Sequence, residues 1–346
     1  MRAAWYERRG PAREVLIVGE MPDPQPGPGE VRLAVAVSGL SPGDIKKRAG
    51  WQGAPMEYPR IVPHSDGAGV IDAVGPGVEE ARVGRPAWCY GAQSYRQFGT
   101  AAELVVVPSE LAVDLPSVED PNQAAALAEQ AACLGIAGIT AHRAIFGDGP
   151  VAGLDVLIHG AVGGVGSIAT QMARRDRARV IAVVRRGQEA RALELGADHV
   201  FLSGAPDLAH QIREVAPNGV HRIAEVDFAS HIDLDASVIA IGGVISSYST
   251  SDDHPPIPYW QLGFADSTVH LLGSDDFPAA VKTVAARDLT DALAEGSLRS
   301  SIAARVPLAD IATAHEMVEQ GARGRVVVVV ADESSQPAGP KRDRGQ

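Results

Sequence analysis

The chain has 346 residues, of which 45% are hydrophobic and 21% are charged, and its formal net charge is -12. This length predicts two domains, and the acidic charge argues against a nucleic-acid partner, because phosphate binding requires a basic surface. No apolar run approaches the length of a membrane span, and the charged start MRAAWYERRG lacks the apolar core of a signal peptide. We therefore expect a cytoplasmic enzyme. Its two cysteines, Cys89 and Cys133, are too few for a disulfide framework.

Residues 1–124 are predicted to form a first, β-rich domain. Residues 30–39 alternate apolar and polar positions, as a half-buried strand does. Two further short runs, at 67–78 and 100–110, are typical of strands bounded by Gly and Pro. The following segment, 122–146, is rich in Ala and helical in period, with Asn122 as the expected cap.

Residues 125–274 are predicted to form a second, α/β domain. Short apolar runs alternate with helical stretches from Val156 onward, which indicates βαβ units and a parallel sheet with helices on both faces. Residues 275–332 contain two helical stretches and the strand RVVVVVA at 325–331, and we expect them to return to the first domain. The polar tail at 333–346 is predicted to be disordered.

A glycine-rich loop follows the first strand of the α/β domain. In LIHGAVGGVGSIATQ, Gly163 and Gly164 allow a close backbone approach to a pyrophosphate, and Gly166 allows tight packing of helix on strand. The loop precedes a helix, whose N-terminus favours bound anions. The alternative is a tight turn that binds nothing. The surrounding βαβ pattern favours a dinucleotide.

The end of the next strand distinguishes between the two nicotinamide dinucleotides. An NAD site usually has Asp or Glu there, to bind the ribose hydroxyls. This chain has Arg185 and Arg186, which can bind a 2′-phosphate through charge-assisted hydrogen bonds. The two arginines could also be ordinary surface residues, and Glu189 weighs mildly against a phosphate. We expect NADPH.

Several motifs together resemble one family. They are SGLSPGDIKKRAG (38–50), HSDGAGVIDAVGPGV (64–78), GTAAELVVVP (99–108), GIAGITAHRAI (135–145), HGAVGGVG (159–166) and ELGADHVF (194–201). The chain resembles the zinc-independent, zeta-crystallin-like quinone oxidoreductases of the medium-chain dehydrogenase/reductase superfamily over residues 1–331. The resemblance implies a GroES-like β domain, a Rossmann domain and a homodimer.

The resemblance also implies a set of cofactor contacts. For the pyrophosphate and the adenosine end, these are Gly163, Gly164, Val165, Arg185, Arg186 and Ser203. Along the cleft and near the nicotinamide, they are Asp227, Tyr248, Ser249, Ser41, Asp44 and Thr140. The family often has Asn where this chain has Ser41, and Tyr where it has Ser203.

The zinc-dependent relatives hold their catalytic metal at positions that align with Ser41, Ser65 and Ile136, which cannot form a ligand set. His64 is adjacent to one of these positions, and we expect it to pair with a backbone group instead. We therefore expect no metal, and hydride transfer to an acceptor that is already electrophilic. A quinone is the first candidate, and a conjugated enone or enoyl compound is the alternative. An NADPH-binding sensor without turnover is a further alternative.

Aromatic side chains on loops are candidates for the substrate pocket, although packing in the core or on the surface explains each of them equally well. They are Trp51, Tyr58, Tyr95, Tyr259 and Trp260. No spacing identifies a catalytic acid, and a hydroquinone anion can take its proton from water. The β-like run at 267–274 is expected at the edge of the parallel sheet, where an open edge favours a two-fold dimer.

Overall fold

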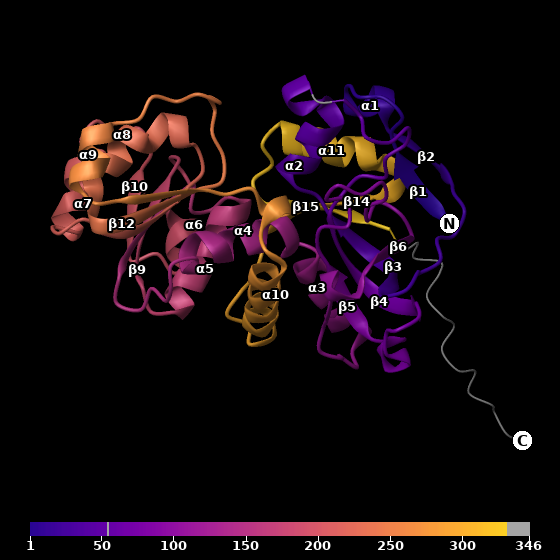
Figure 1. Cartoon of the computed structure of the whole chain (residues 1–346). Helices are drawn as coiled ribbons and strands as arrows, with labels where there is room; N and C mark the ends of the chain where they lie inside the picture. Colours follow the sequence, from indigo (N-terminus) through magenta and orange to yellow (C-terminus); the bar gives the residue numbers. More distant parts are fainter. Residues whose placement is uncertain (54, 331–346) are drawn as a thin grey trace, which may run out of the picture.

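The computed structural model describes residues 1–53 and 55–330, and it contains two units that lie side by side (Figure 1). The chain starts in the first unit, passes into the second and returns to the first. The last strands, yellow in Figure 1, accordingly lie among the indigo and purple strands of the first unit. This architecture, in which one unit is built on a mixed sheet and the other on a parallel sheet, agrees with the predicted fold class.

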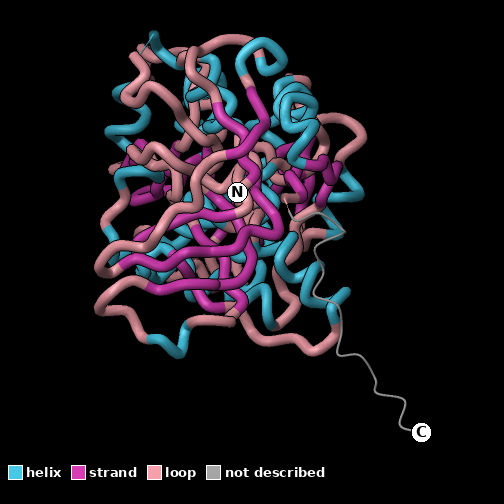
Figure 2. The backbone as a smooth tube through the Cα atoms, turned by 90° about the vertical axis from the view of Figure 1, so that its right-hand side faces the viewer, coloured by secondary structure: helices cyan, strands magenta, loops and turns pink. Residues whose placement is uncertain are grey.

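The first unit is built on a seven-stranded sheet with the order β14-β15-β3-β4-β5-β7, and β6 also pairs with β3. Figure 2 views the molecule from the side of this unit and shows its strands in magenta, nearest the viewer. The elements of its N-terminal part are β1 (Arg2–Trp5), α1 (Ala12–Val15), β2 (Ile17–Glu20), β3 (Glu30–Gly39), α2 (Pro42–Ala49), η1 (Trp51–Gly53), β4 (Asp66–Val74), η2 (Glu80–Arg82), β5 (Pro86–Cys89), β6 (Leu104–Pro108), η3 (Ser109–Leu111), β7 (Ala112–Asp114) and α3 (Pro121–Ala131). The strand expected at 30–39 is confirmed as β3, whose side chains alternate between buried and half-buried.

The second unit is a six-stranded sheet with the order β10-β9-β8-β11-β12-β13, in which every pair is parallel. Its elements are α4 (Gly135–Phe146), β8 (Asp155–His159), α5 (Gly164–Arg175), β9 (Arg179–Val184), α6 (Glu189–Glu194), β10 (His199–Leu202), α7 (Leu208–Val215), β11 (Val220–Glu225), α8 (Phe228–Val238), β12 (Ile239–Ser247), α9 (Tyr259–Phe264), β13 (Thr268–Leu271) and η4 (Ser274–Asp276). The carboxyl ends of these strands meet at one edge, where such sheets bind ligands.

Both faces of this sheet are covered by helices, as predicted. Along β8, Val156 and Ile158 belong to the core that the sheet shares with α4, α5 and α10 (Ala279–Ala294). Leu157, which points to the opposite face, belongs to the core that the sheet shares with α7, α8 and α9. This alternation follows from the two-residue period of a strand, and it explains why the central strands are apolar throughout.

The helix expected at 122–146 is two helices, α3 and α4, bent by 60° at their break. Asp120, and not Asn122, caps the first helix, because its carboxylate accepts hydrogen bonds from the backbone N–H groups of residues 122 and 123. The break brings the N-terminus of α4 to the buried Asp66, which accepts the Ile136 N–H at 2.8 Å. In the described part of the chain, no single helix is long and apolar enough to cross a membrane, and only this bent pair meets both criteria jointly.

The return to the first unit is made by β14 (Ile302–Pro307), η5 (Leu308–Asp310), α11 (Ile311–Glu319) and β15 (Arg325–Val329). Strand β14, which was not expected from the sequence, pairs in parallel with β15. The predicted domain limits at 124 and 274 fall inside α3 and at the start of η4, while the limit at 332 and the tail at 333–346 lie outside the described residues.

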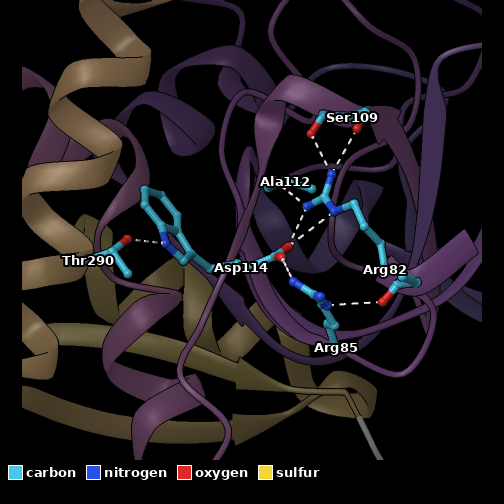
Figure 3. A network of polar contacts seen from close by, with 8 residues as sticks. Arg82, Arg85, Ser109, Ala112, Asp114 and Thr290 are labelled. Carbon is cyan, nitrogen blue, oxygen red and sulfur yellow. Dashed lines mark hydrogen bonds and ion pairs between the residues drawn. The ribbon is translucent and has the colours of Figure 1, made fainter. Parts of the chain in front are cut away.

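Polar side chains fix the first unit internally and against α10 (Figure 3). Arg82 binds Asp114 and Ser109, which ties η2 to β7 and η3. The indole N–H of Trp88, on β5, donates to Thr290 Oγ1 of α10 at 2.9 Å. Since α10 also packs against α4, this contact links the two units directly.

Candidate functional site

The glycine loop connects β8 to α5 at the carboxyl edge of the parallel sheet. Gly160 has a φ of 62°, and Gly163 caps α5, which begins at Gly164. A Cβ atom on Gly166 would lie 2.2 Å from the Gly160 carbonyl oxygen, so this position admits only glycine. The loop therefore keeps a backbone surface and a helix N-terminus open to a phosphate group.

A cavity of about 570 Å³ lies between the two units, over this loop. Nine of the residues predicted to bind cofactor or substrate line it: Ser41, Trp51, Tyr95, Thr140, Gly163, Gly164, Val165, Tyr248 and Ser249. They come from α2, η1, α4, the glycine loop and the end of β12, together with a loop of the first unit. Segments that are far apart in the sequence therefore line the same cavity.

Four of the predicted residues lie along the same sheet edge, outside the residues that line the cavity. Arg185, Arg186 and Ser203 are predicted for the adenosine end, and Asp227 is predicted for the cleft. Arg185 and Arg186 directly follow β9 and are exposed. Ser203, which follows β10, donates its N–H to the carbonyl of Val184 at 2.8 Å. Asp227 follows β11, and its carboxylate accepts the N–H of residue 251 at 2.7 Å.

Four further predicted residues do not line the cavity. Asp44 is buried in α2, where its carboxylate accepts the Ser41 N–H at 2.8 Å, and burial raises its pKa to about 6. Tyr58 donates to a backbone carbonyl on a neighbouring loop. Tyr259 and Trp260 are 66% and 69% exposed on α9, in edge-to-face contact with each other. The structure therefore does not bring these last two to a substrate pocket.

Arg325 is the main residue of the cavity that the sequence analysis missed. It begins β15 and is 7% exposed, and its guanidinium reaches across to the glycine loop. Its Nη1 lies 3.3 Å from the position that a Cβ atom on Gly164 would take. The Nε and Nη2 atoms are buried without a hydrogen-bond partner. The guanidinium hydrogen-bonds the Cys133 thiol, and its charge offsets part of the rise in pKa that burial causes at Asp44 and Asp66. Its unpartnered N–H groups remain available to an anion at the glycine loop, because a buried donor without a partner is costly.

Polar contacts close the cavity at one side by joining the first unit to η4. Lys47 Nζ lies 3.1 Å from Asp275 Oδ2, and Ser94 Oγ donates to Asp275 Oδ1 at 2.5 Å. The Tyr95 hydroxyl donates to Asp276 Oδ2 at 2.8 Å, a bond that raises the pKa of Tyr95 to about 12. This phenol therefore remains protonated at neutral pH and is occupied by its acceptor.

The positions that correspond to zinc ligands in the zinc-dependent relatives carry no metal-binding side chain. Ser41 and Ile136 line the cavity, whereas Ser65 is buried. His64 is buried and pairs with side chains, which corrects the expected backbone partner. Its Nδ1 lies 2.8 Å from Ser38 Oγ, and its Nε2 lies 3.0 Å from Nε2 of His315.

Two family models match this chain, one for each unit. The alcohol dehydrogenase GroES-like domain matches residues 27–117, and the zinc-binding dehydrogenase domain matches residues 164–286. The first range covers β3 to β7, and the second covers the parallel sheet from α5 into α10. Both therefore agree with the division of the chain into two units.

Curated relatives cover much of the chain. A quinone oxidoreductase of Rattus norvegicus is 31% identical over 69% of each chain. A 2-haloacrylate reductase of Burkholderia sp is 30% identical over 91% of this chain and 94% of the relative. The chain also matches a mycocerosic acid synthase-like polyketide synthase of Mycobacterium tuberculosis, of which it spans only 13%.

A solved structure resembles the whole described chain. It is a mycobacterial protein in complex with NADPH, with a TM-score of 0.79, 26% sequence identity and coverage of 95% of this chain and 100% of that one. At this coverage the likeness extends over both units.

Proposed function

This chain belongs to the medium-chain dehydrogenase/reductase superfamily, within its zinc-independent, quinone oxidoreductase-like branch, and on that premise we propose that it transfers a hydride from NADPH to a quinone. The observation that carries the proposal is the buried guanidinium of Arg325, which faces the glycine loop and whose Nε and Nη2 atoms have no hydrogen-bond partner. A dinucleotide pyrophosphate, with its two negative charges, satisfies this guanidinium and the open helix N-terminus together.

The residues present fit NADPH at each of its parts. Arg325 and the backbone from Gly163 to Val165 would hold the pyrophosphate. The adjacent adenosine ribose would reach the exposed Arg185 and Arg186, which suit a 2′-phosphate. When bound, NADPH supplies a hydride from its nicotinamide ring. The protein contributes binding and positioning, which are the main tasks of the protein in such reactions.

A quinone fits the acceptor side of the cavity. Trp51 and Tyr95 line this side and offer flat apolar faces to a ring, while Ser41 and Thr140 add hydroxyl groups. The side chains at the zinc-ligand positions cannot hold a metal ion that would act as a Lewis acid. A quinone needs no such activation, because it is already electrophilic. The hydroquinone anion that forms is only weakly basic, so water can protonate it. We therefore assign no catalytic acid.

Reduction of an activated C=C bond is the second candidate, and Lys46 favours it. This lysine lines the cavity, and its Nζ lies 5.2 Å from the ring centre of Trp51. Within residues 1–53 and 55–330, no carboxylate forms an ion pair with it. A cation without a carboxylate partner at the acceptor side suits a carboxylate-bearing enoyl substrate, and one relative is named a 2-haloacrylate reductase.

Steady-state kinetics with four acceptors tests the assignment. The proposal predicts the highest kcat/KM with 9,10-phenanthrenequinone or 1,4-benzoquinone, and a lower value with an alkenal or with 2-chloroacrylate. The opposite order would make the protein an enoyl reductase. Tight NADPH binding without oxidation by any acceptor would indicate a sensor.

We further propose that the protein forms a homodimer through β13. This strand ends the parallel sheet, and its Leu271 is 76% exposed. Other exposed apolar side chains surround this edge: Ile241, Tyr259, Trp260 and Phe264. An open strand edge beside exposed apolar groups favours pairing with a second copy about a two-fold axis.

A further inference from the structure

Four ionisable side chains gather beneath the glycine loop, outside the cavity. His159 ends β8 and Glu225 ends β11, whereas His231 and Asp235 are one turn apart on α8. The side chains of His159, Glu225 and Asp235 are at most 1% exposed. The neighbouring residues Gly160 and Val226 line the cavity, so this cluster lies directly behind the cofactor site.

Within the described residues, the two carboxylates of the cluster pair with the imidazoles of His159 and His231 and with each other. Asp235 contacts His159, and Glu225 accepts hydrogen bonds from His231 Nδ1 at 2.9 Å and from the Asp227 N–H. Among the described residues, no lysine or arginine pairs with either carboxylate. Glu225 Oε2 and Asp235 Oδ2 are buried without a hydrogen-bond partner. Burial raises the pKa of both carboxyls, that of Asp235 to about 7, so the pair is neutralised either by a proton held between them or by a bound cation.

The distances in the cluster match those between ligands of a small cation. Zinc binds nitrogen and oxygen at about 2.0–2.2 Å, so two ligand atoms on a tetrahedral ion are about 3.3 Å apart. His159 Nε2 lies 2.8 Å from Asp235 Oδ1 and 3.4 Å from Glu225 Oε2. One imidazole and two carboxylates can therefore close around one ion with only small side-chain movements.

His231 has a different task in this arrangement. Although its ligand atom lies within 4.8 Å of those of His159 and Glu225, the two imidazole rings are stacked, with centroids 4.3 Å apart and planes 10° apart. Stacked rings cannot both direct a lone pair at one ion. The hydrogen bond from His231 instead orients Glu225, as partners behind metal ligands commonly do.

We propose that His159, Glu225 and Asp235, oriented by His231, bind one divalent transition-metal cation of the Zn²⁺ type. The ion joins the ends of β8 and β11 to α8 and neutralises the two carboxylates. Because it lies behind the glycine loop, it has a structural role and takes no part in hydride transfer. The proposal does not depend on which acceptor the enzyme reduces.

The test measures metal binding by the whole chain without an affinity tag. Metal content is determined by plasma mass spectrometry, and chelator-treated protein is titrated with Co²⁺, whose visible absorption reports the coordination, and then with Zn²⁺. We expect one equivalent of either ion and displacement of Co²⁺ by Zn²⁺. Asp235→Asn should weaken binding at least about 100-fold, and His231→Gln by about 10- to 100-fold.

A surface pair provides the matched control. His210 and Glu214 form an exposed His–carboxylate contact at 3.4 Å, and His210→Gln should leave the affinity unchanged. Circular dichroism and NADPH titration verify that each variant is folded. If Asp235→Asn does not fold, the test relies on His231→Gln alone. A folded wild-type chain that binds no Co²⁺ or Zn²⁺ would overturn the proposal, and a shared proton would then balance the charge. Unchanged affinity in folded Asp235→Asn or His231→Gln would overturn it as well.

Discussion

Replacing Arg325 with Met tests the proposed cofactor site. Methionine keeps an unbranched apolar side chain in this buried position but removes the charge. Arg325 is 7% exposed, so solvent screens its charge little, and its Nη1 lies 3.3 Å from a Cβ position on the glycine loop. A hydrogen bond to a charged group contributes about 1.5–3 kcal/mol. The dissociation constant of NADPH should therefore rise by about 10- to 150-fold.

The effect must be the same for both nicotinamide dinucleotides, because the pyrophosphate is common to them. We would titrate NADPH and NADH by fluorescence or calorimetry, with thermal unfolding as a check of the fold. Arg323→Met is the matched control, since this exposed arginine lies two residues before Arg325. A folded Arg325→Met that binds NADPH within threefold of the wild type would refute the assignment. Loss of NADPH affinity alone would place Arg325 at the 2′-phosphate.

The remaining predictions concern specificity, packing, acid stability and assembly. The double variant Arg185→Ala, Arg186→Ala should have a KM for NADPH raised about 10- to 100-fold and an unchanged KM for NADH. If this variant still prefers NADPH in the steady-state assay, the two arginines do not bind the 2′-phosphate. Gly166→Ala places a Cβ atom 2.2 Å from a carbonyl oxygen, so calorimetry should show NADPH affinity reduced more than about tenfold. Burial lowers the pKa of His315 to about 2, below the unfolded value of about 6.5. The unfolded chain therefore takes up the proton first as the pH falls. Through this group the free energy of unfolding decreases by about 2 kcal/mol from pH ~7 to ~5. Denaturant titrations of His315→Gln should lack this contribution. Leu271→Asp, at a side chain that is 76% exposed, should give a folded monomer by light scattering, whereas a wild-type monomer would refute the dimer.

The second unit could be predicted from the sequence because local patterns determine it. Apolar strands and helical stretches alternate along one contiguous segment, and the glycine loop has a fixed place in such a sheet. The first unit was harder to predict. Its strand β14 pairs with β15, which in turn pairs with β3 at the other end of the chain, and no local pattern specifies such a partner.

The site shows the same distinction between local and distant information. Gly163 and Gly164 could be identified because the loop is a local motif. Arg325 could not, because only the pairing of β15 in the first unit brings its guanidinium to the loop of the second. Tyr259 and Trp260 were assigned to the pocket from their residue type alone, which does not distinguish a pocket from an exposed sheet edge.

The position of β15 also affects the order in which the chain folds during synthesis. The parallel sheet is complete once β13 has left the ribosome, so the second unit can fold on the nascent chain. In contrast, β3 emerges early and waits for β15, which pairs with its Val37–Gly39 end and is made almost last. Until then part of an apolar strand edge stays unpaired, which is a risk of aggregation. Early termination of translation would therefore leave a folded second unit attached to an incomplete first one.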